Sequence, residues 1–192
     1  MKLLFDLFML RDGPYRHACE SAYAPYWITA FVVAVGSLFG ALVAVFQRVT
    51  GGEIQGFPVA EIPDWILLVG NVIPGMVIVV AVHAGIAIVA WLMVKGVSGR
   101  GHLGALYRTT GYLLPLGVPA LPLIAANTMD ATADPAALPF QNLYAPLGAF
   151  GLCLFVLGLF QGIRVVEGLS LLRSVVATAL FTLFSFSMLL IF

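Results

Sequence analysis

Few residues in this chain have the chemistry for catalysis or proton transfer, and they are widely spaced. His83 is the only ionisable residue at the centre of any long apolar run. An ionisable group inside a membrane is by default a functional hypothesis, and an imidazole changes charge near neutral pH, so His83 is a candidate proton relay or pH sensor. The alternative is a neutral imidazole bonded to a backbone carbonyl that a proline of the third apolar run has freed.

The remaining candidates for chemistry are weaker. His17, Cys19 and Glu20 have metal-binding side chains, but a fourth ligand is missing and adjacent residues on a helix point apart. The turn "SGRGH" (98–102) lacks the Lys-Ser/Thr pair of a phosphate-binding loop. Arg164 and Glu167, three residues apart, predict a surface ion pair. Since no pair of residues suited to intramembrane proteolysis is present either, we expect no catalytic residue, no metal and no cofactor.

Composition places the chain in a bilayer. Of its 192 residues 61% are hydrophobic and 9% are charged, and the mean hydropathy is +1.05, whereas soluble domains carry about 25% charged residues. Nine basic residues, balanced by nine acidic ones, are too few for a nucleic-acid surface. Cys19 and Cys153 are far apart and predict no disulfide. Seven of the nine basic residues are arginine, which together with abundant Ala, Gly, Val and Leu is typical of a GC-rich bacterial gene.

The elements expected from this pattern are five spanning helices of an all-α, polytopic membrane protein, since about 20 apolar residues cross a bilayer. Asn71 and Pro74 suggest that residues 63–71 form a separate interfacial piece. Residues 1–26 precede the first span, and their start is either an amphipathic helix on the membrane surface or a frayed terminus. We therefore expect one membrane domain, 1–192, with spans at about 27–47, 72–94, 106–126, 143–165 and 171–191.

The charges of the loops predict the orientation. One side of the five predicted spans carries eight basic residues, whereas the other side carries one basic and five acidic residues. The positive-inside rule then places the N-terminus in the cytoplasm and the C-terminus outside. The eight are Lys2, Arg11, Arg16, Lys95, Arg100, Arg108, Arg164 and Arg173; the one on the other side is Arg48.

Small residues and prolines indicate how the spans pack. Gly36 and Gly40 in the first span, and Gly158 and Gly162 in the fourth, form small-residue stripes that permit close helix contact, either within the chain or with another copy. Pro115, Pro119 and Pro122 share one face of the third span, which we expect to be kinked and buried. The kink serves either packing or, in a transporter, a broken helix that lines a substrate site.

Four stretches together resemble the Yip family, the Rab-GTPase-interacting membrane proteins of the secretory pathway. "YAPYW" (23–27) resembles the family's tyrosine-glycine-proline-leucine-tryptophan motif, with Ala24 in place of the usual glycine. "GYLLPL" (111–116) resembles its glycine-tyrosine-x-leucine-leucine-proline motif in the third span. The runs at 99–115 and 162–177 are similar to the bacterial branch of the family.

This resemblance implies a five-span fold and a non-enzymatic role in organising membranes or partner proteins. Eukaryotic members use a long cytosolic N-terminal region to bind Rab GTPases, and the roughly 26 residues before the first span count against a Rab-type partnership here. The residues proposed for function or packing are His83, Arg108, Tyr112, Pro115, Pro119, Tyr23, Pro25 and Trp27. Those proposed to contact lipid headgroups or a partner are Arg11, Arg16, Lys95 and Arg100.

The sequence thus predicts a bacterial inner-membrane protein whose partners are the lipid bilayer and other membrane proteins or itself, as an accessory subunit of a larger complex. The rival hypothesis is a small transporter or channel that uses His83 and a broken third helix. Transporters place several polar residues at mid-depth, and here His83 is essentially alone.

Overall fold

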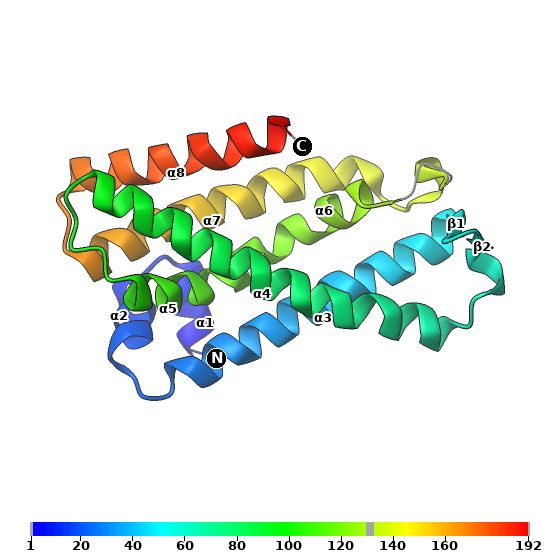
Figure 1. Cartoon of the computed structure of the whole chain (residues 1–192), viewed down its shortest axis with the longest axis horizontal. Helices are drawn as coiled ribbons and strands as arrows, with labels where there is room; N and C mark the ends of the chain where they lie inside the picture. The colour runs from blue at the N-terminus through cyan, green and yellow to red at the C-terminus, as the bar shows by residue number, and fades with distance from the viewer. Residues whose placement is uncertain (1, 130–132, 192) are drawn as a thin grey trace. The chain divides into compact units, whose positions relative to one another are not determined.

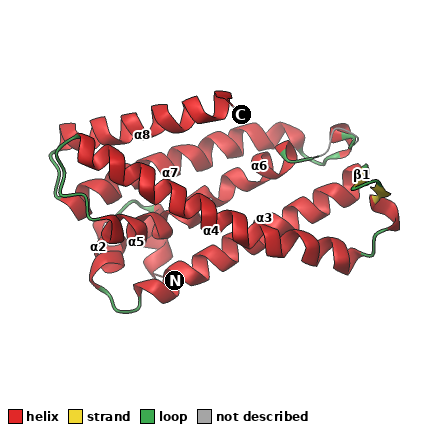
Figure 2. Cartoon of the chain, in the orientation of Figure 1, coloured by secondary structure: helices red, strands yellow, loops and turns green. Residues whose placement is uncertain are grey.

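The computed structural model describes residues 2–129 and 133–191, and these residues are almost entirely helical (Figure 1). The strands in the described residues are β1 (Glu53–Ile54) and β2 (Phe57–Pro58), an antiparallel hairpin in which Glu53 faces Pro58 (Figure 2). The predicted all-α class is confirmed. The α-helices are α1 (Lys2–Phe8), α2 (Asp12–Glu20), α3 (Ala24–Thr50), α4 (Asp64–Gly96), α5 (Leu103–Leu113), α6 (Leu121–Asn127), α7 (Tyr144–Glu167) and α8 (Leu171–Ile191).

Four helical segments of the described chain are long and apolar enough to cross a membrane, as predicted for the first four spans. They are Ala24–Thr50, Asp64–Gly96, Leu103–Asn127 and Gln141–Glu167. The described apolar part of α8, Leu171–Ser187, is shorter, so the fifth span stays a prediction. The short 3-10 helices are η1 (Val59–Glu61), η2 (Leu114–Ala120), η3 (Pro135–Ala137) and η4 (Gln141–Leu143).

The predicted break before the second span is wrong. Residues 64–71 belong to α4, which continues through Pro74 as one helix (Figure 1). The Asn71 side chain, taken from the sequence as a boundary signal, donates hydrogen bonds to the Leu67 carbonyl (2.8 Å) and to the Gln47 side chain on α3 (2.9 Å). A polar residue whose donors are satisfied does not end a helix, because no unpaired group remains.

The third apolar segment is not one regular helix. The α-helical pattern of α5 gives way at Leu114 to η2, and α-helix resumes with α6 at Leu121. Pro115 and Pro119 both lie in η2. Because proline has no N–H to donate to the carbonyl four residues earlier, two prolines four residues apart favour the tighter 3-10 winding over an α-helix.

The helices contribute to two compact units, described separately. Unit 1 comprises Met1–Phe31, Ala81–Leu116 and Cys153–Phe192, and unit 2 comprises Val32–Val80 and Gly117–Leu152. The chain passes from one unit to the other within α3, α4, η2 and α7. These shared elements leave no linker at which to divide the chain. The single domain expected from the sequence stays a prediction.

In unit 2 the glycine stripe of α3 lies directly on α4. A Cβ at Gly36 would stand 2.6 Å from the Cα of Met76, and one at Gly75 would stand 2.6 Å from the carbonyl oxygen of Gly36. A Cβ at Gly40 would meet the backbone of Asn71. Only glycine permits this backbone approach. The stripe therefore packs within the chain, the first of the two alternatives left open by the sequence.

The core of unit 1 joins the N-terminal helices to the end of α4, α5, α7 and α8. Its fully buried side chains include Leu7 from α1, Tyr15 from α2, Val94 from α4 and Ile163 from α7. The glycines of "GLFQG" face this core: a Cβ at Gly162 would stand 2.6 Å from Thr109 Cγ2. This second stripe also packs within the chain.

Candidate functional site

The N-terminal segment is folded rather than frayed. Leu7 on α1 and Tyr15 and Ala18 on α2 are fully buried, and α2 packs along α5. A Cβ at Gly158 would stand 3.4 Å from the Tyr15 hydroxyl, so Tyr15 anchors α2 against α7. Residues 2–8 are therefore helical as predicted, and the frayed terminus is wrong, because α1 and α2 bury apolar side chains in the core of unit 1. The position of α1 on the membrane surface stays a prediction.

The basic residues separate from the acidic ones by structural unit. Unit 1 contains eight of the nine basic residues and four acidic ones, whereas unit 2 contains one basic residue, Arg48, and four acidic residues among those described. Arg48 is held internally: its guanidinium donates to the carbonyls of Val59 (2.7 Å) and Ile62 (2.5 Å) and pairs with Asp64 (2.5 Å). Unit 1 thus carries the excess of basic residues, and unit 2 carries the excess of acidic residues.

The cations of unit 1 that the sequence proposes for contact with lipid or a partner differ in their interactions within the chain. Arg11 pairs with Asp6 (2.9 Å) and lies over the Phe5 ring (5.9 Å). Lys95 donates to the Arg100 carbonyl (2.9 Å), and the Arg16 and Arg100 side chains are exposed. Arg11 and Lys95 therefore support the local fold. The exposed side chains of Arg16 and Arg100 form no hydrogen bond or ion pair with the described residues.

Glu167, at the end of α7, has different partners from the one that the sequence predicts. Its carboxylate is buried and accepts hydrogen bonds from the backbone N–H of Gly101 (2.7 Å) and of His102 (3.2 Å). The predicted ion pair with Arg164 is wrong, since Glu167 is turned into the glycine-rich turn instead and Arg164 is exposed. The backbone N–H groups of a glycine-rich turn bind anions, so the Gly-x-Gly sequence at 99–101 is the signal that points to a carboxylate partner.

The turn that Glu167 binds is fixed from a second side. The Trp91 indole N–H donates to the Gly101 carbonyl (2.8 Å), and the Gly99 N–H donates to the Val94 carbonyl (2.9 Å). Gly101 has φ of +61°, a left-handed conformation that favours glycine. The turn between α4 and α5 is thus a rigid link, and its exposed members are Ser98, Arg100 and His102.

His83 lies buried in unit 1 with 1% of its surface exposed. Its Nε2–H donates to the Tyr107 carbonyl on α5 (2.8 Å), and the two rings lie 4.3 Å apart. This is the backbone-carbonyl partner expected from the sequence, but the expected cause is wrong. Pro115 frees the carbonyl of Gly111, four residues earlier, whereas Tyr107 lies eight residues before it.

His83 shares a contact site with the start of α3. A Cβ at Gly111 would touch both the Ile28 side chain (2.8 Å) and the His83 ring (3.2 Å). His83 itself lies near the middle of α4, which runs from Asp64 to Gly96.

The two segments that resemble Yip motifs both contact Phe31 in unit 1. Tyr112 is fully buried and packs edge-on against Phe31 of α3 (5.6 Å), which also contacts Trp27 (5.8 Å). Pro115 is buried and Pro119 is half-buried, each within η2. Tyr23, Pro25 and Trp27 are exposed, as expected for aromatic residues that anchor a helix at a membrane interface.

Arg108 and Cys19 connect α5 to α2. The Arg108 guanidinium donates to the Cys19 carbonyl (3.4 Å), and the Cys19 sulfur lies 3.9 Å from the Thr109 hydroxyl. Burial raises the pKa of the Cys19 thiol, which disfavours the thiolate that metals bind. No group of three His, Cys, Asp or Glu side chains with metal-site geometry occurs among the described residues.

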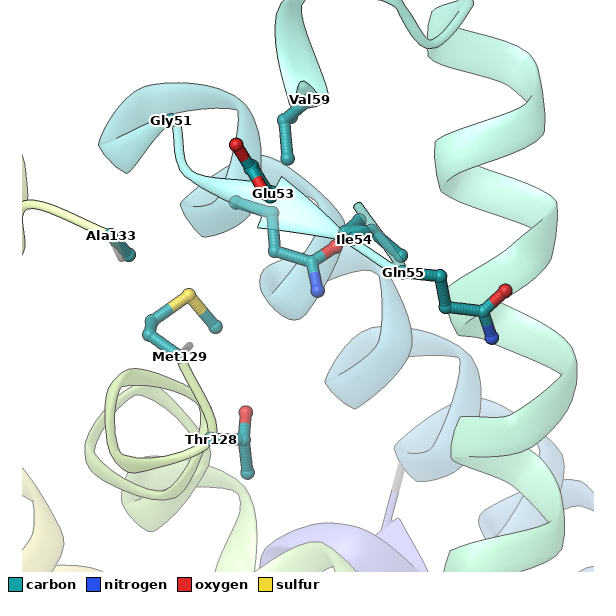
Figure 3. Close-up of a pocket in the computed structure, with 9 residues that line it drawn as sticks. Gly51, Glu53, Ile54, Gln55, Val59, Thr128, Met129 and Ala133 are labelled. Atoms are coloured by element: carbon teal, nitrogen blue, oxygen red, sulfur yellow. The ribbon is translucent and has the colours of Figure 1, made fainter. Parts of the chain in front are cut away.

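A polar hollow of about 220 Å³ lies in unit 2, where the hairpin faces the end of α6 (Figure 3). Gln47, Glu53, Gln55 and Thr128 supply polar lining, together with Met129. Two of these groups are already engaged: the Gln47 side chain accepts from Asn71, and the Thr128 hydroxyl donates to the Ala125 carbonyl (2.8 Å). The hollow therefore offers few free groups to a ligand.

Comparison with known proteins assigns no family. No protein-family model matches the chain, and no curated protein or solved structure matches it. The resemblance to the Yip family therefore stays a hypothesis that depends on the motifs within the chain.

Proposed function

We propose that this chain is a non-enzymatic bacterial inner-membrane protein, resembling the Yip family, that organises partner membrane proteins as an accessory subunit of a larger complex. One observation carries the proposal: unit 1 is folded, carries eight basic residues against four acidic ones, and uses three of the four acidic residues internally, whereas Glu20 on α2 is exposed. Asp6 pairs with Arg11, Asp12 accepts from Gln161 (2.5 Å), and Glu167 accepts from the turn at Gly101. Arg16 and Arg100 are left exposed for an acidic partner or for anionic headgroups.

The orientation follows from the same charge separation. With five spans, including α8, the loops that carry the eight basic residues lie in the cytoplasm, and the N-terminus and C-terminus lie on opposite sides. The helical change at η2 then produces the kinked third span. Reporter fusions test this topology: a cytoplasmically active fluorescent protein should function at the N-terminus, and alkaline phosphatase should be active at the C-terminus. Phosphatase that is inactive there would contradict a five-span chain.

The accessory-subunit role is tested by purifying the tagged chain from its native membrane in nanodiscs and identifying the proteins that accompany it. We expect the same membrane proteins in every preparation, and we expect them to be lost when Arg16→Glu and Arg100→Glu are combined. Glu61→Lys, an equally exposed charge change in unit 2, is the matched control. A chain that emerges alone in each preparation would overturn the proposal.

A further inference from the structure

A long apolar groove runs between α7 and α8 in unit 1, separate from the region described above. Its volume is about 600 Å³, and its lining is nearly all apolar. It lies within helices of the predicted fourth and fifth spans. The lining residues are Val156, Leu157, Phe160, Val175, Thr178, Ala179, Thr182 and Leu183.

A free cation lies at one end of this groove. Val156, Phe160 and Arg164 follow one another at four-residue steps on α7 and therefore share one face of the helix. Arg164 is exposed and forms no hydrogen bond or ion pair with any residue of the described part of the chain, because Glu167 is turned toward Gly101. Its charge is available to an anion outside the chain.

Arg164 lies near the end of α7, three residues before Glu167. Glu167 bonds Gly101, and Gly162 lies against Thr109, so Arg164, between them on α7, is level with residues 105–107 of α5. At 1.5 Å per residue, Phe160 lies about 6 Å and Val156 about 12 Å farther from that end of the helix. The groove therefore runs from the end of α7 toward its middle. In a bilayer that α7 crosses, an arginine so near the end of the helix lies at the interface.

A polar group without a partner lies in the wall of the groove. The Thr178 hydroxyl is buried and has no hydrogen-bond partner among the described residues, and the residue is 6% exposed. Thr178 follows Val175 by one turn, so it lies slightly deeper than the start of the groove. A rotation of about 120° about χ1 moves the hydroxyl into the place that the methyl group occupies and turns it toward the groove.

We infer that the groove holds one acyl chain of an anionic glycerophospholipid, with its phosphate on Arg164 and an ester carbonyl accepting from Thr178. The order of groups matches such a lipid: a cation at the interface, a hydroxyl about one turn deeper, then apolar walls. Charge favours this occupant over a second copy of the chain, since a symmetric dimer through this face brings two Arg164 side chains together. The inference requires that α7 and α8 lie in a bilayer, but it does not require the partner-organising role.

Native mass spectrometry of the purified full chain tests the inference, with phosphatidylglycerol and phosphatidylcholine of identical acyl chains as probes. We expect wild-type protein to retain one phosphatidylglycerol preferentially, and Arg164→Ala to weaken that retention about fivefold. Arg173→Ala is the matched control: Arg173 is exposed on α8 but lies two residues before Val175, on another face. Equal weakening by the two substitutions would overturn the inference, because it would mean general charge attraction.

A second pair of variants tests the position of the acyl chain. Ala179→Trp fills the groove without changing charge and should abolish retention, whereas Leu180→Trp, outside the lining, should preserve it. Undiminished retention in Ala179→Trp contradicts the inference. The native Cys153, exposed on α7, reports a second copy in the groove: copper-catalysed Cys153 disulfide dimers in a Cys19→Ser background would overturn the lipid assignment. Folding of each variant is checked by its helical circular dichroism.

Discussion

The carboxylate of Glu167 accepts a hydrogen bond of 2.7 Å from the backbone N–H of Gly101, 66 residues earlier in the chain. This contact ties the end of α7 to the turn between α4 and α5, and a second bond from the His102 N–H reinforces it. An ionised acceptor bonded to backbone donors makes a stronger bond than a neutral pair. The contact accordingly holds α7 and the turn between α4 and α5 together in unit 1. The sequence predicts an ion pair with Arg164 instead.

Removal of this carboxylate should destabilise the protein. Glu167→Ala leaves two backbone N–H groups without their acceptor, and we expect a loss of about 2 kcal/mol in the free energy of unfolding. Thermal unfolding in detergent, followed by circular dichroism, measures the change. Arg164→Ala should change stability by less than about 0.5 kcal/mol. Equal losses of stability in the two variants would support an ion pair between Glu167 and Arg164 and contradict the bond to Gly101.

A methyl group between α3 and α4 should separate the two helices. The Cβ of Gly40→Ala would collide with the Asn71 backbone, and we expect a loss of about 2 kcal/mol in the free energy of unfolding. Gly70→Ala is the matched control, since nothing lies within 4 Å of the position of its Cβ. Its stability should be unchanged or rise by up to about 1 kcal/mol. Unfolding midpoints in one detergent decide the comparison, and a tolerated Gly40→Ala would refute the close contact.

The Tyr15 hydroxyl should reduce stability rather than add to it. The hydroxyl is buried without a partner among the described residues, so Tyr15→Phe should raise the free energy of unfolding by about 1 kcal/mol. Burial, and then the nearby Asp12, raise the pKa of Tyr15 above its ordinary value of 10.0. The unfolded chain therefore loses this proton first, and wild-type stability should fall as pH rises above 10.

This alkaline loss is measured by repeating the unfolding experiment at pH 8 and above pH 10. The difference between Tyr15→Phe and wild type should grow with pH, because phenylalanine does not ionise. Tyr23→Phe, an exposed position with 69% of its surface accessible, provides the control and should follow wild type at each pH. A Tyr15→Phe difference that shrinks at high pH would contradict the assigned direction of the pKa shift.

Substitution of His83 should leave no transport defect. The ring donates to the Tyr107 carbonyl, and its buried Nδ1 has no hydrogen-bond partner among the described residues, so the structure shows no chain of partners that would relay a proton. Proteoliposomes with an internal pH-sensitive dye should show the same slow proton leak for wild type, His83→Ala and protein-free vesicles. An added protonophore verifies that the vesicles are sealed. Robust flux that disappears in His83→Ala would favour the transporter hypothesis instead.

Helix class, four of the spans and the separation of charge could be predicted from the sequence because each depends on local composition. A run of apolar residues must satisfy its backbone internally as a helix in lipid, whatever its neighbours are. The small-residue spacing at Gly36 and Gly40 likewise indicated a helix contact. The failures occurred where a polar side chain had two candidate partners. The sequence alone favours Asn71 as a helix boundary and pairs Glu167 with Arg164, its near neighbour on the helix.

The sequence by itself determined that this is a helical membrane protein whose excesses of basic and acidic residues lie in different segments of the chain. Only the tertiary structure decided which side chains meet: Glu167 with Gly101, His83 with Tyr107, and Tyr112 with Phe31. The reason is that apolar runs specify helices one at a time, whereas partners far apart in sequence are chosen by the register in which helices pack.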